Sequence, residues 1–299
     1  MTDMLLRAVR GYAEAHCDAT GLARTPIPGL FAIRQIMTSE LQHAIYRPLV
    51  CLVVQGTKQI SLGNRSLTHD AGATLLITAD VPTVSRITRA SLAEPYLSLA
   101  LYLDPTVIAD LLVEMQVAQE GANAPLRIDP TEQEVADTAL RLVRLLDRPE
   151  SVPVLQAQFV REMHYWLLAG RHGSAIRQLG SPDSHAQRIA RAVALIREEY
   201  AKPLPIERLA EAARMSVSSF HQHFRAITTL SPLQFQKQLR LMEARRLMLA
   251  KGTSASHAAY SVGYESVPQF TREYGRMFGL SPARHLRATK GGMEAAAVY

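Results

Sequence analysis

Two segments of the chain, fifty residues apart, repeat one spacing of aromatic and hydrogen-bonding residues. Each begins with a serine, Ser216 or Ser266, whose hydroxyl can accept bonds from the free N–H groups at the start of a helix. The helices predicted after these serines expose polar side chains. In the first helix these are Ser218, Ser219, His221, Gln222 and Arg225, and in the second, with Ser266 at its start, they are Gln269, Thr271, Arg272 and Arg276. Such side chains could distinguish base pairs by their donor and acceptor patterns, because arginine favours guanine and glutamine favours adenine.

Apolar residues in and around these segments predict the helix pairs that would position them. Phe220 and Phe224 in the first segment, like Phe270 and Tyr274 in the second, lie four residues apart and so on one helix face. A short preceding helix is indicated by apolar residues at Ile206, Leu209, Ala210 and Ala213. This is the layout of a helix-turn-helix, whose second helix enters the DNA major groove. One unit alone is weak support, because many amphipathic helix pairs only meet water, but two units in tandem strengthen the interpretation.

The segment between the two units predicts a long helix. Ser231 and Pro232 form a helix start, with serine as the cap and proline where its missing N–H is harmless. About 17 residues of good helix formers follow, which would span about 25 Å at 1.5 Å per residue. A rigid spacer of this length would hold the two exposed helices roughly 34 Å apart, about one DNA turn. Arg225, Arg276 and Arg246 are then expected to contact phosphates, which set position and affinity.

Charge is unevenly distributed along the chain. Residues 1–184 contain 16 Lys and Arg against 19 Asp and Glu, whereas residues 185–299 contain 17 against 8. The C-terminal third therefore carries all of the positive excess, which favours a negatively charged partner such as nucleic acid or a membrane surface. Charge alone decides little, because many solvated faces are rich in arginine.

The N-terminal part predicts many short strands followed by helices. From Phe31 to Leu103 the chain alternates β-forming residues with turn signals such as Gly63-Asn64, a pattern typical of a barrel or sandwich. Apolar periodicity then predicts helices over 105–119, 130–146 and 152–169. Their apolar stripes serve either the core or a subunit interface.

The residue pattern disfavours metal binding and catalysis. Cys17 and Cys51 fit neither a metal spacing nor a disulfide framework. The strand region offers only His43 and His69, too few for a metal-binding barrel. The single H-x-H motif, at 221–223, lies on a predicted helix, where the two rings point about 200° apart. No phosphate-binding loop or nucleophile motif is present.

These residues resemble a known family. Through LAEAARMSVSSFHQHFRAITTLSPLQFQKQLRLMEARRLML and VGYESVPQFTREYGRMFGLSP, the C-terminal part is similar to the DNA-binding domain of AraC/XylS transcription regulators. The N-terminal part resembles one AraC-type subfamily through LVCLVVQGTKQISLG, AGATLLITADVPT and EPYLSLALYLD. The resemblance implies a cupin-like barrel that senses a small molecule, with dimerisation helices. It also implies that the base-facing residues are Ser218, His221, Gln222, Gln269 and Arg272.

The sequence departs from the family pattern at several positions. Arg214 and Thr229 stand where glycine is usual and where a positive φ is often required, at a cost on the order of 1 kcal/mol for a residue such as threonine. Ala255 and Ala258 replace larger aliphatic residues, which predicts a thinner core in the second unit. Pro268 sits one place later than usual, still within the first helical turn.

We therefore expect an α+β chain with an N-terminal cupin-like β-barrel and flanking helices, and a C-terminal all-α double helix-turn-helix domain. The expected boundaries are 1–175 for the sensor and dimerisation domain, 176–186 for a linker, 187–290 for the DNA-binding domain and 291–299 for a disordered tail. The expected function is cytoplasmic, effector-modulated transcription regulation without catalysis, cofactor, metal or membrane. Expected partners are double-stranded DNA, a small-molecule effector, RNA polymerase and a second copy of the chain. Two alternatives stay open: an architectural DNA-binding protein without a ligand, and a cupin-type enzyme fused to a DNA-binding domain.

Overall fold

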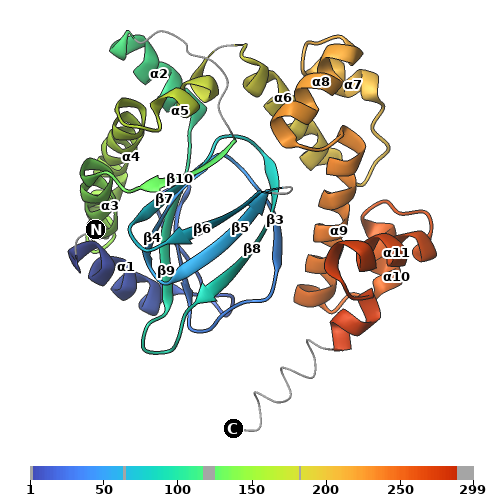
Figure 1. Cartoon of the computed structure of the whole chain (residues 1–299), viewed down its shortest axis with the longest axis horizontal. Helices are drawn as coiled ribbons and strands as arrows, with labels where there is room; N and C mark the ends of the chain where they lie inside the picture. The colour runs from blue at the N-terminus through green and yellow to red at the C-terminus, as the bar shows by residue number, and fades with distance from the viewer. Residues whose placement is uncertain (1–2, 63–64, 117–124, 182, 288–299) are drawn as a thin grey trace. The chain divides into compact units, whose positions relative to one another are not determined.

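The computed structural model describes residues 3–62, 65–116, 125–181 and 183–287 of the chain. It divides into two compact units, Met1–Gln187 and Arg188–Tyr299. All described strands belong to the first unit, and the described elements of the second are helices (Figure 1). The expected turn at Gly63-Asn64 and the expected tail at 291–299 lie outside the described residues.

The first unit contains two antiparallel sheets. One has the strand order β1-β2-β9-β4-β7-β10 and the other β3-β8-β5-β6. The strands are β1 (Leu22–Arg24), β2 (Leu30–Gln35), β3 (Gln42–Tyr46), β4 (Leu49–Gln55), β5 (Thr57–Leu62), β6 (Arg65–Asp70), β7 (Ala73–Ile77), β8 (Val81–Arg89), β9 (Tyr96–Tyr102) and β10 (Leu126–Pro130). Strands β4 and β9 are buried along almost their whole length, so both faces of the larger sheet are covered.

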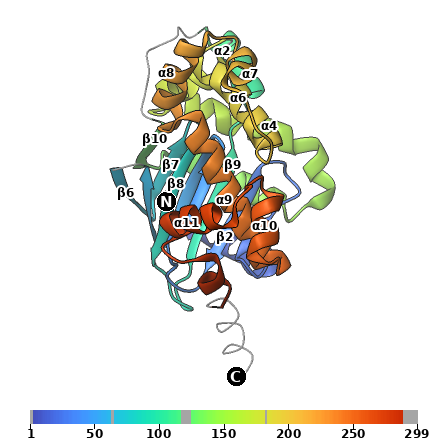
Figure 2. The same ribbon diagram turned by 90° about the vertical axis from the view of Figure 1, so that its right-hand side faces the viewer.

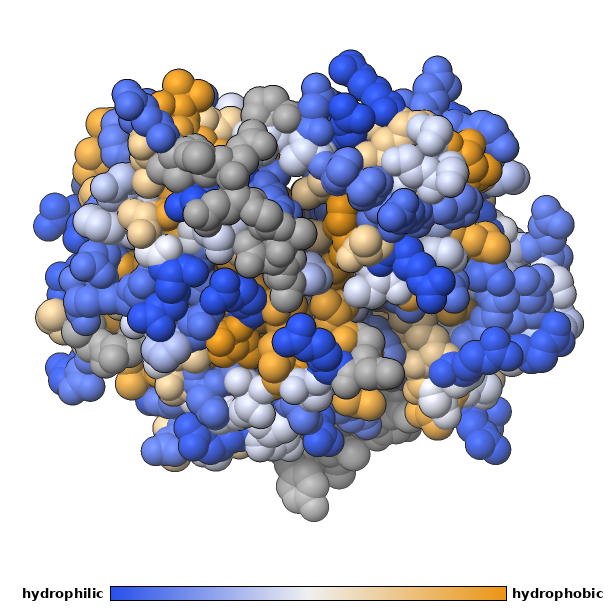
Figure 3. All heavy atoms as spheres, turned by 45° about the horizontal axis from the view of Figure 1, so that its top comes forward, coloured by the Kyte–Doolittle hydropathy of each residue, from blue (hydrophilic) through white to orange (hydrophobic). Residues whose placement is uncertain are grey.

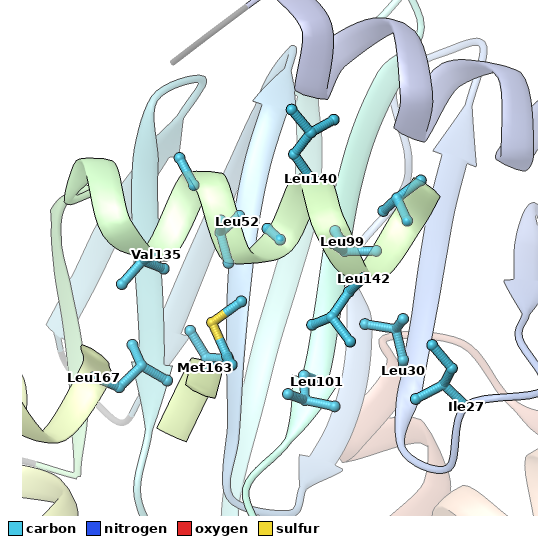
Figure 4. Close-up of a cluster of buried hydrophobic side chains, with 14 of the residues drawn as sticks. Ile27, Leu30, Leu52, Leu99, Leu101, Val135, Leu140, Leu142, Met163 and Leu167 are labelled. Atoms are coloured by element: carbon cyan, nitrogen blue, oxygen red, sulfur yellow. The ribbon is translucent and has the colours of Figure 1, made fainter. Parts of the chain in front are cut away.

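Helices cover one face of the larger sheet. They are α1 (Asp3–His16), α2 (Pro105–Met115), α3 (Gln133–Leu145), α4 (Val152–Ala169) and α5 (Gly173–Gly180), with a short 3-10 turn at Pro149–Ser151. Figure 4 shows Leu140 and Leu142 of α3 and Met163 of α4 in one cluster with Leu99 and Leu101 of β9, within one continuous core. The apolar stripes of α3 and α4 therefore supply core contacts.

The opposite face of the larger sheet meets the smaller sheet. Because successive side chains on a strand alternate between faces, Val53 and Tyr96 point away from the helices. Both pack with Ile87 of β8, which belongs to the smaller sheet. Alternate residues of β4, β5, β8 and β9 therefore lie between the two sheets.

The three helices expected in this unit are present with changed bounds. Helix α4 begins and ends where the sequence indicates, at 152 and 169. Helix α2 ends at Met115, with Gln116 in a left-handed conformation as its cap, and 117–119 lie outside the described residues. The predicted start of the next helix at Pro130 was wrong: Pro130 ends strand β10, and α3 begins at Gln133. Apolar periodicity alone did not reveal that the segment first pairs with β7.

The second unit contains most of α6 (His185–Glu199), which begins just before its boundary at Arg188. The helices that follow are α7 (Ile206–Ala212), α8 (Val217–Thr228), α9 (Pro232–Lys251), α10 (Ala255–Ser261) and α11 (Val267–Phe278). Helix α9 runs between the α7–α8 pair and the α10–α11 pair (Figure 2). The segment expected as a linker, 176–186, contains the end of α5 and the start of α6.

The turns of the two helix pairs use left-handed backbone conformations. Arg214 and Thr229 have φ of 51° and 66°, which confirms that both stand at positions where glycine is favoured. The equivalent positions of the second pair, Gly263 and Gly279, have φ of 86° and 74°. At Gly263 a Cβ atom would lie 1.9 Å from the carbonyl oxygen of Ala201, so this turn has no room for a side chain.

Candidate nucleic-acid interface

Helix α8 presents a polar face because its aromatic residues fix the opposite face in the core. The predicted cap is confirmed: the Ser216 hydroxyl accepts a hydrogen bond from the backbone N–H of Ser219 at 3.3 Å. Phe220 and Phe224 are fully buried, with ring centroids 5.3 Å apart. On the remaining surface Ser219 is half-buried, and the exposed residues are Ser218, His221, Gln222 and Arg225.

Helix α11 repeats this arrangement. The Ser266 hydroxyl caps the helix by accepting from the N–H of Gln269 at 3.4 Å, and Pro268 lies in the first turn, both as predicted. Phe270 and Tyr274 are fully buried. Ser266 itself is half-buried, as is Thr271, whereas the exposed residues are Gln269, Arg272 and Arg276.

The two helix pairs draw the bulk of their cores from different residues. In the first, the rings of Phe224 and Phe235 meet edge to face with centroids 5.6 Å apart. In the second, α10 contributes the small residues Ala258 and Ala259, while Tyr264, from the turn after α10, packs edge to face against Phe270 at 5.3 Å. Helices α8 and α11 are thus both held by ring contacts at their buried faces.

Helix α9 is the predicted spacer and is confirmed as a single helix. Ser231 and Gln234 form a reciprocal capping box, Pro232 occupies the first turn, and Gly252 ends the helix in a left-handed conformation. Its 20 residues correspond to a length of about 30 Å. A helix of this length separates α8 from α11 by a fixed amount.

Arg240 of α9 bonds the segment after α6 and the turn after α10, a role that the sequence did not reveal. Its guanidinium donates to the carbonyl oxygens of Tyr200 at 2.6 Å, Gly263 at 2.8 Å and Lys202 at 3.1 Å. Gln236 adds bonds to Tyr200 and Lys202. These contacts join the end of α6 to the turn of the second helix pair.

Glu273 is a second feature that the sequence did not reveal. Its carboxylate accepts from Lys237 Nζ at 2.8 Å, from the Tyr264 hydroxyl at 2.7 Å and from Gln269 Nε2 at 3.3 Å. Burial alone would raise the pKa of Glu273, but the hydrogen bonds from Lys237, Tyr264 and Gln269 outweigh it and lower that pKa. The ionised Glu273 therefore orients the side chain of Gln269 on the polar face of α11.

The exposed arginines of α8 and α11 are available to bind anions. Arg225, Arg272 and Arg276 form no salt bridge with any residue in the described ranges. Arg246, also expected to contact phosphate, is exposed and pairs with Glu243 on α9, with 2.6 Å between Nη2 and Oε1. Figure 3 shows hydrophilic residues over most of the visible face of this unit. Guanidinium groups of this kind suit phosphate oxygens and guanine edges.

Other site types receive little support from the described residues. His221 is exposed and His223 half-buried on the same helix, and no described group of three or more His, Cys, Asp or Glu side chains could hold a metal ion. Cys17 and Cys51 are free thiols. Among the helices that the structure describes, none is long and apolar enough to cross a membrane.

Comparisons with known proteins match both parts of the chain. Residues 26–175 match the family model described as the AraC-type transcriptional regulator N-terminus, and residues 209–288 match a helix-turn-helix domain model. The chain is 28% identical over 95 residues to the transcriptional activator RhaS of Escherichia fergusonii, covering 32% of this chain and 34% of that protein. It is 26% identical over 171 residues to the virulence regulon activator VirF of Yersinia enterocolitica, covering 56% of this chain and 60% of that protein. The match thus spans about a third to three fifths of these curated relatives.

Solved structures show the same fold. The apo form of a ToxT variant from Vibrio cholerae superposes with a TM-score of 0.59 at 12% identity, covering 88% of this chain and 98% of that chain. Wild-type ToxT bound to an unsaturated fatty acid gives a TM-score of 0.56 at 11% identity, covering 86% and 93%. At this identity the likeness shows the fold: a sheet-rich N-terminal part followed by a helical C-terminal part.

Proposed function

Because the chain belongs to the AraC-type transcriptional regulators, which bind DNA, we propose that its helices α8 and α11 read two successive major-groove segments of one DNA site. One observation carries this proposal: two serine-capped helices bury aromatic pairs, expose hydrogen-bonding residues and are joined by a 20-residue helix. A spacer of about 30 Å is close to the roughly 34 Å repeat of the major groove.

The proposal assigns different roles to the exposed residues. Base contacts are assigned to Ser218, His221 and Gln222 in α8 and to Gln269 and Arg272 in α11. Arg225 and Arg276, further along each helix, would bind phosphates, while the half-buried Ser219, Ser266 and Thr271 would meet the DNA backbone at the helix starts. Glu273 would limit the rotamers of Gln269 before DNA binds, which reduces the entropy lost on binding.

Selection from random DNA duplexes at two salt concentrations tests the two-reader model. The parent should enrich a bipartite motif with parts about one turn apart, and Gln222→Ala and Arg272→Ala should each relax one part, at about 1 to 3 kcal/mol per lost base contact. Arg246→Ala is the matched control: a phosphate contact carries no sequence information, so its loss should lower the affinity for all duplexes alike and leave both parts of the motif intact. Enrichment of a single half, or salt-sensitive binding without a motif, would favour the architectural alternative.

We further propose that the two sheets of the first unit form a cupin-like barrel that binds a small-molecule effector. The packing of Val53, Ile87 and Tyr96 between the sheets supports this, and a ToxT structure with this fold holds an unsaturated fatty acid. An effector alters DNA binding only if it binds two states of the protein unequally. We place the protein in the cytoplasm, where its DNA and RNA polymerase are, and assign it no catalytic step.

We also propose that the protein acts as a homodimer through the helices of the first unit. Val154, Leu155 and Tyr165 of α4 are exposed to 67%, 38% and 38%, although other residues of this helix lie in the core. Apolar side chains on a helix face favour burial against a second copy. Light scattering should give twice the mass of the chain, and the monomer mass would contradict this part of the proposal.

A further inference from the structure

A single buried lysine lies between the two sheets of the first unit. Lys58 of β5 is 8% exposed and is the only lysine among the first 201 residues. Its Nζ donates to the Tyr46 hydroxyl at 3.3 Å and lies 5.7 Å from the centre of that ring. No carboxylate within the described part of the chain pairs with it. Buried lysines are rare unless paired, so an ammonium held only by a phenol requires an explanation.

Several neighbouring polar groups also lack hydrogen-bond partners. The hydroxyls of Tyr96, Ser98 and Ser85 are at most 1% exposed, and beyond the contacts of Ser98 with Tyr96 and Cys51 they have no hydrogen-bond partner among the described residues. His69, which pairs with Lys58 across strands β5 and β6, bonds the Ala73 carbonyl through Nε2 and leaves its buried Nδ1 unsatisfied. Native proteins satisfy the great majority of buried polar groups, so this concentration around one cation indicates a binding site.

The cluster carries one positive charge near neutral pH. Burial disfavours the charged form of Lys58, but Tyr46, Tyr96 and Cys51 together outweigh it and raise its pKa, so the ammonium persists. Burial lowers the pKa of His69 to about 4, so its imidazole is neutral. Because the Nε2 of a neutral His69 then carries the proton that bonds Ala73, its Nδ1 is an acceptor.

We propose that Lys58 binds the carboxylate of a small effector between the sheets, with the Tyr96 and Ser98 hydroxyls as additional donors. This assignment rests on the proposed effector-sensing function and names its chemical class. One cation matches a monoanion, which favours a carboxylate over a doubly charged phosphate. The body of the ligand would be apolar, because Val53, Ile60 and Ile87 are the buried neighbours on the same faces of β4, β5 and β8.

Matched acids and amides test this class directly on the full-length protein. The probes are butanoate, hexanoate and benzoate, their primary amides, and inorganic phosphate, each up to about 10 mM. The readouts are the Tm of the protein and its Kd for a selected DNA duplex. At least one acid should raise the Tm by several degrees and change the Kd severalfold, whereas its amide and phosphate should do neither.

Lys58→Met removes the charge while keeping most of the side-chain volume, and it should abolish the response to the acid. Arg86→Met is the matched control, since Arg86 lies on β8 with its side chain exposed and bonded to Gln59, and it should keep the full response. Tyr96→Phe removes only a hydroxyl and should weaken the response about tenfold. If Lys58→Met does not fold, the response of Tyr96→Phe to the acid tests the proposed site.

Three results would overturn the assignment: no acid stabilises the parent, the amide acts as well as its acid, or a folded Lys58→Met responds like the parent. If Lys58→Met does not fold, a response of Tyr96→Phe equal to that of the parent would overturn it instead. If amides change DNA affinity and acids do not, effector sensing stands while the carboxylate site is rejected. If acids stabilise the protein through Lys58 without changing the Kd, the site stands while its regulatory role is rejected.

Discussion

The two helix-turn-helix pairs share one layout but are stabilised differently. The first pair has a core of phenylalanine rings and places Arg214 and Thr229 in left-handed conformations. The second pair places glycines at the equivalent positions and ties α11 to its surroundings through Glu273. Both pairs bury packed rings, but the first has strained turns, whereas the second has relaxed turns and a polar network. Two copies of one motif can thus reach the same geometry by different balances of forces.

The largest expected effect is at the turn of the second pair. Gly263→Ala introduces a Cβ that would lie 1.9 Å from the Ala201 carbonyl oxygen, at a φ of 86°. Strain and overpacking together should cost about 3 kcal/mol or more. Hydrogen exchange should show α10 and α11 losing protection while α8 keeps it, and DNA selection should retain only the half-site read by α8.

Loss of protection in α8 to the same extent would show that the two pairs unfold as one unit through α9. Arg214→Ala is the control at the equivalent turn of the first pair. Arginine and alanine are equally strained in the left-handed conformation of position 214. The free energy of unfolding should therefore change by no more than about 0.5 kcal/mol.

The next effect concerns the polar network. Glu273→Gln keeps the shape of the side chain but removes the charge that Lys237 binds, so α11 should lose about 1 to 2 kcal/mol near pH 7. The pKa of Glu273 is lowered in the folded state, so its contribution is complete above its unfolded value of about 4.3. The contribution disappears as the pH falls through the lower folded value.

Hydrogen exchange of α11 at several pH values measures this dependence, with α8 as the internal reference. The difference between the parent and Glu273→Gln should be largest above about pH 5 and should shrink as the pH falls through the lowered pKa of Glu273. A difference that is constant with pH would mean that the network acts through shape rather than charge. The affinity for the half-site read by α11 should fall along with its stability, because Gln269 loses its partner.

Local signals in the sequence predicted helices α8 and α11 well. The long-range contacts could not be predicted from the sequence. Ser216, Ser266 and the aromatic pairs act within one or two helical turns, so their effect is visible in any short window. Arg240 bonds carbonyl groups about 23 to 40 residues away, and only the folded chain brings these together. Strand alternation indicated a sheet around Lys58 but gave no sign that the lysine faces inward. Helix α1 also escaped notice, because its role depends on the sheet that it covers.

The smallest expected effect on stability comes from backbone strain alone, at the positions that end α8 and α11. Thr229→Gly should stabilise the first pair by about 1 kcal/mol, because a β-branched residue is strained at a φ of 66°. The reciprocal change, Gly279→Thr, should destabilise the second pair by a similar amount, since a Cβ at Gly279 would meet no atom within 4 Å and only the backbone would resist. Hydrogen exchange at the ends of α8 and α11 should therefore change about fivefold in opposite directions. If Thr229→Gly is destabilising while Gly279→Thr costs the expected amount, the Thr229 side chain makes contacts worth more than its strain, and the first pair is not the more strained of the two.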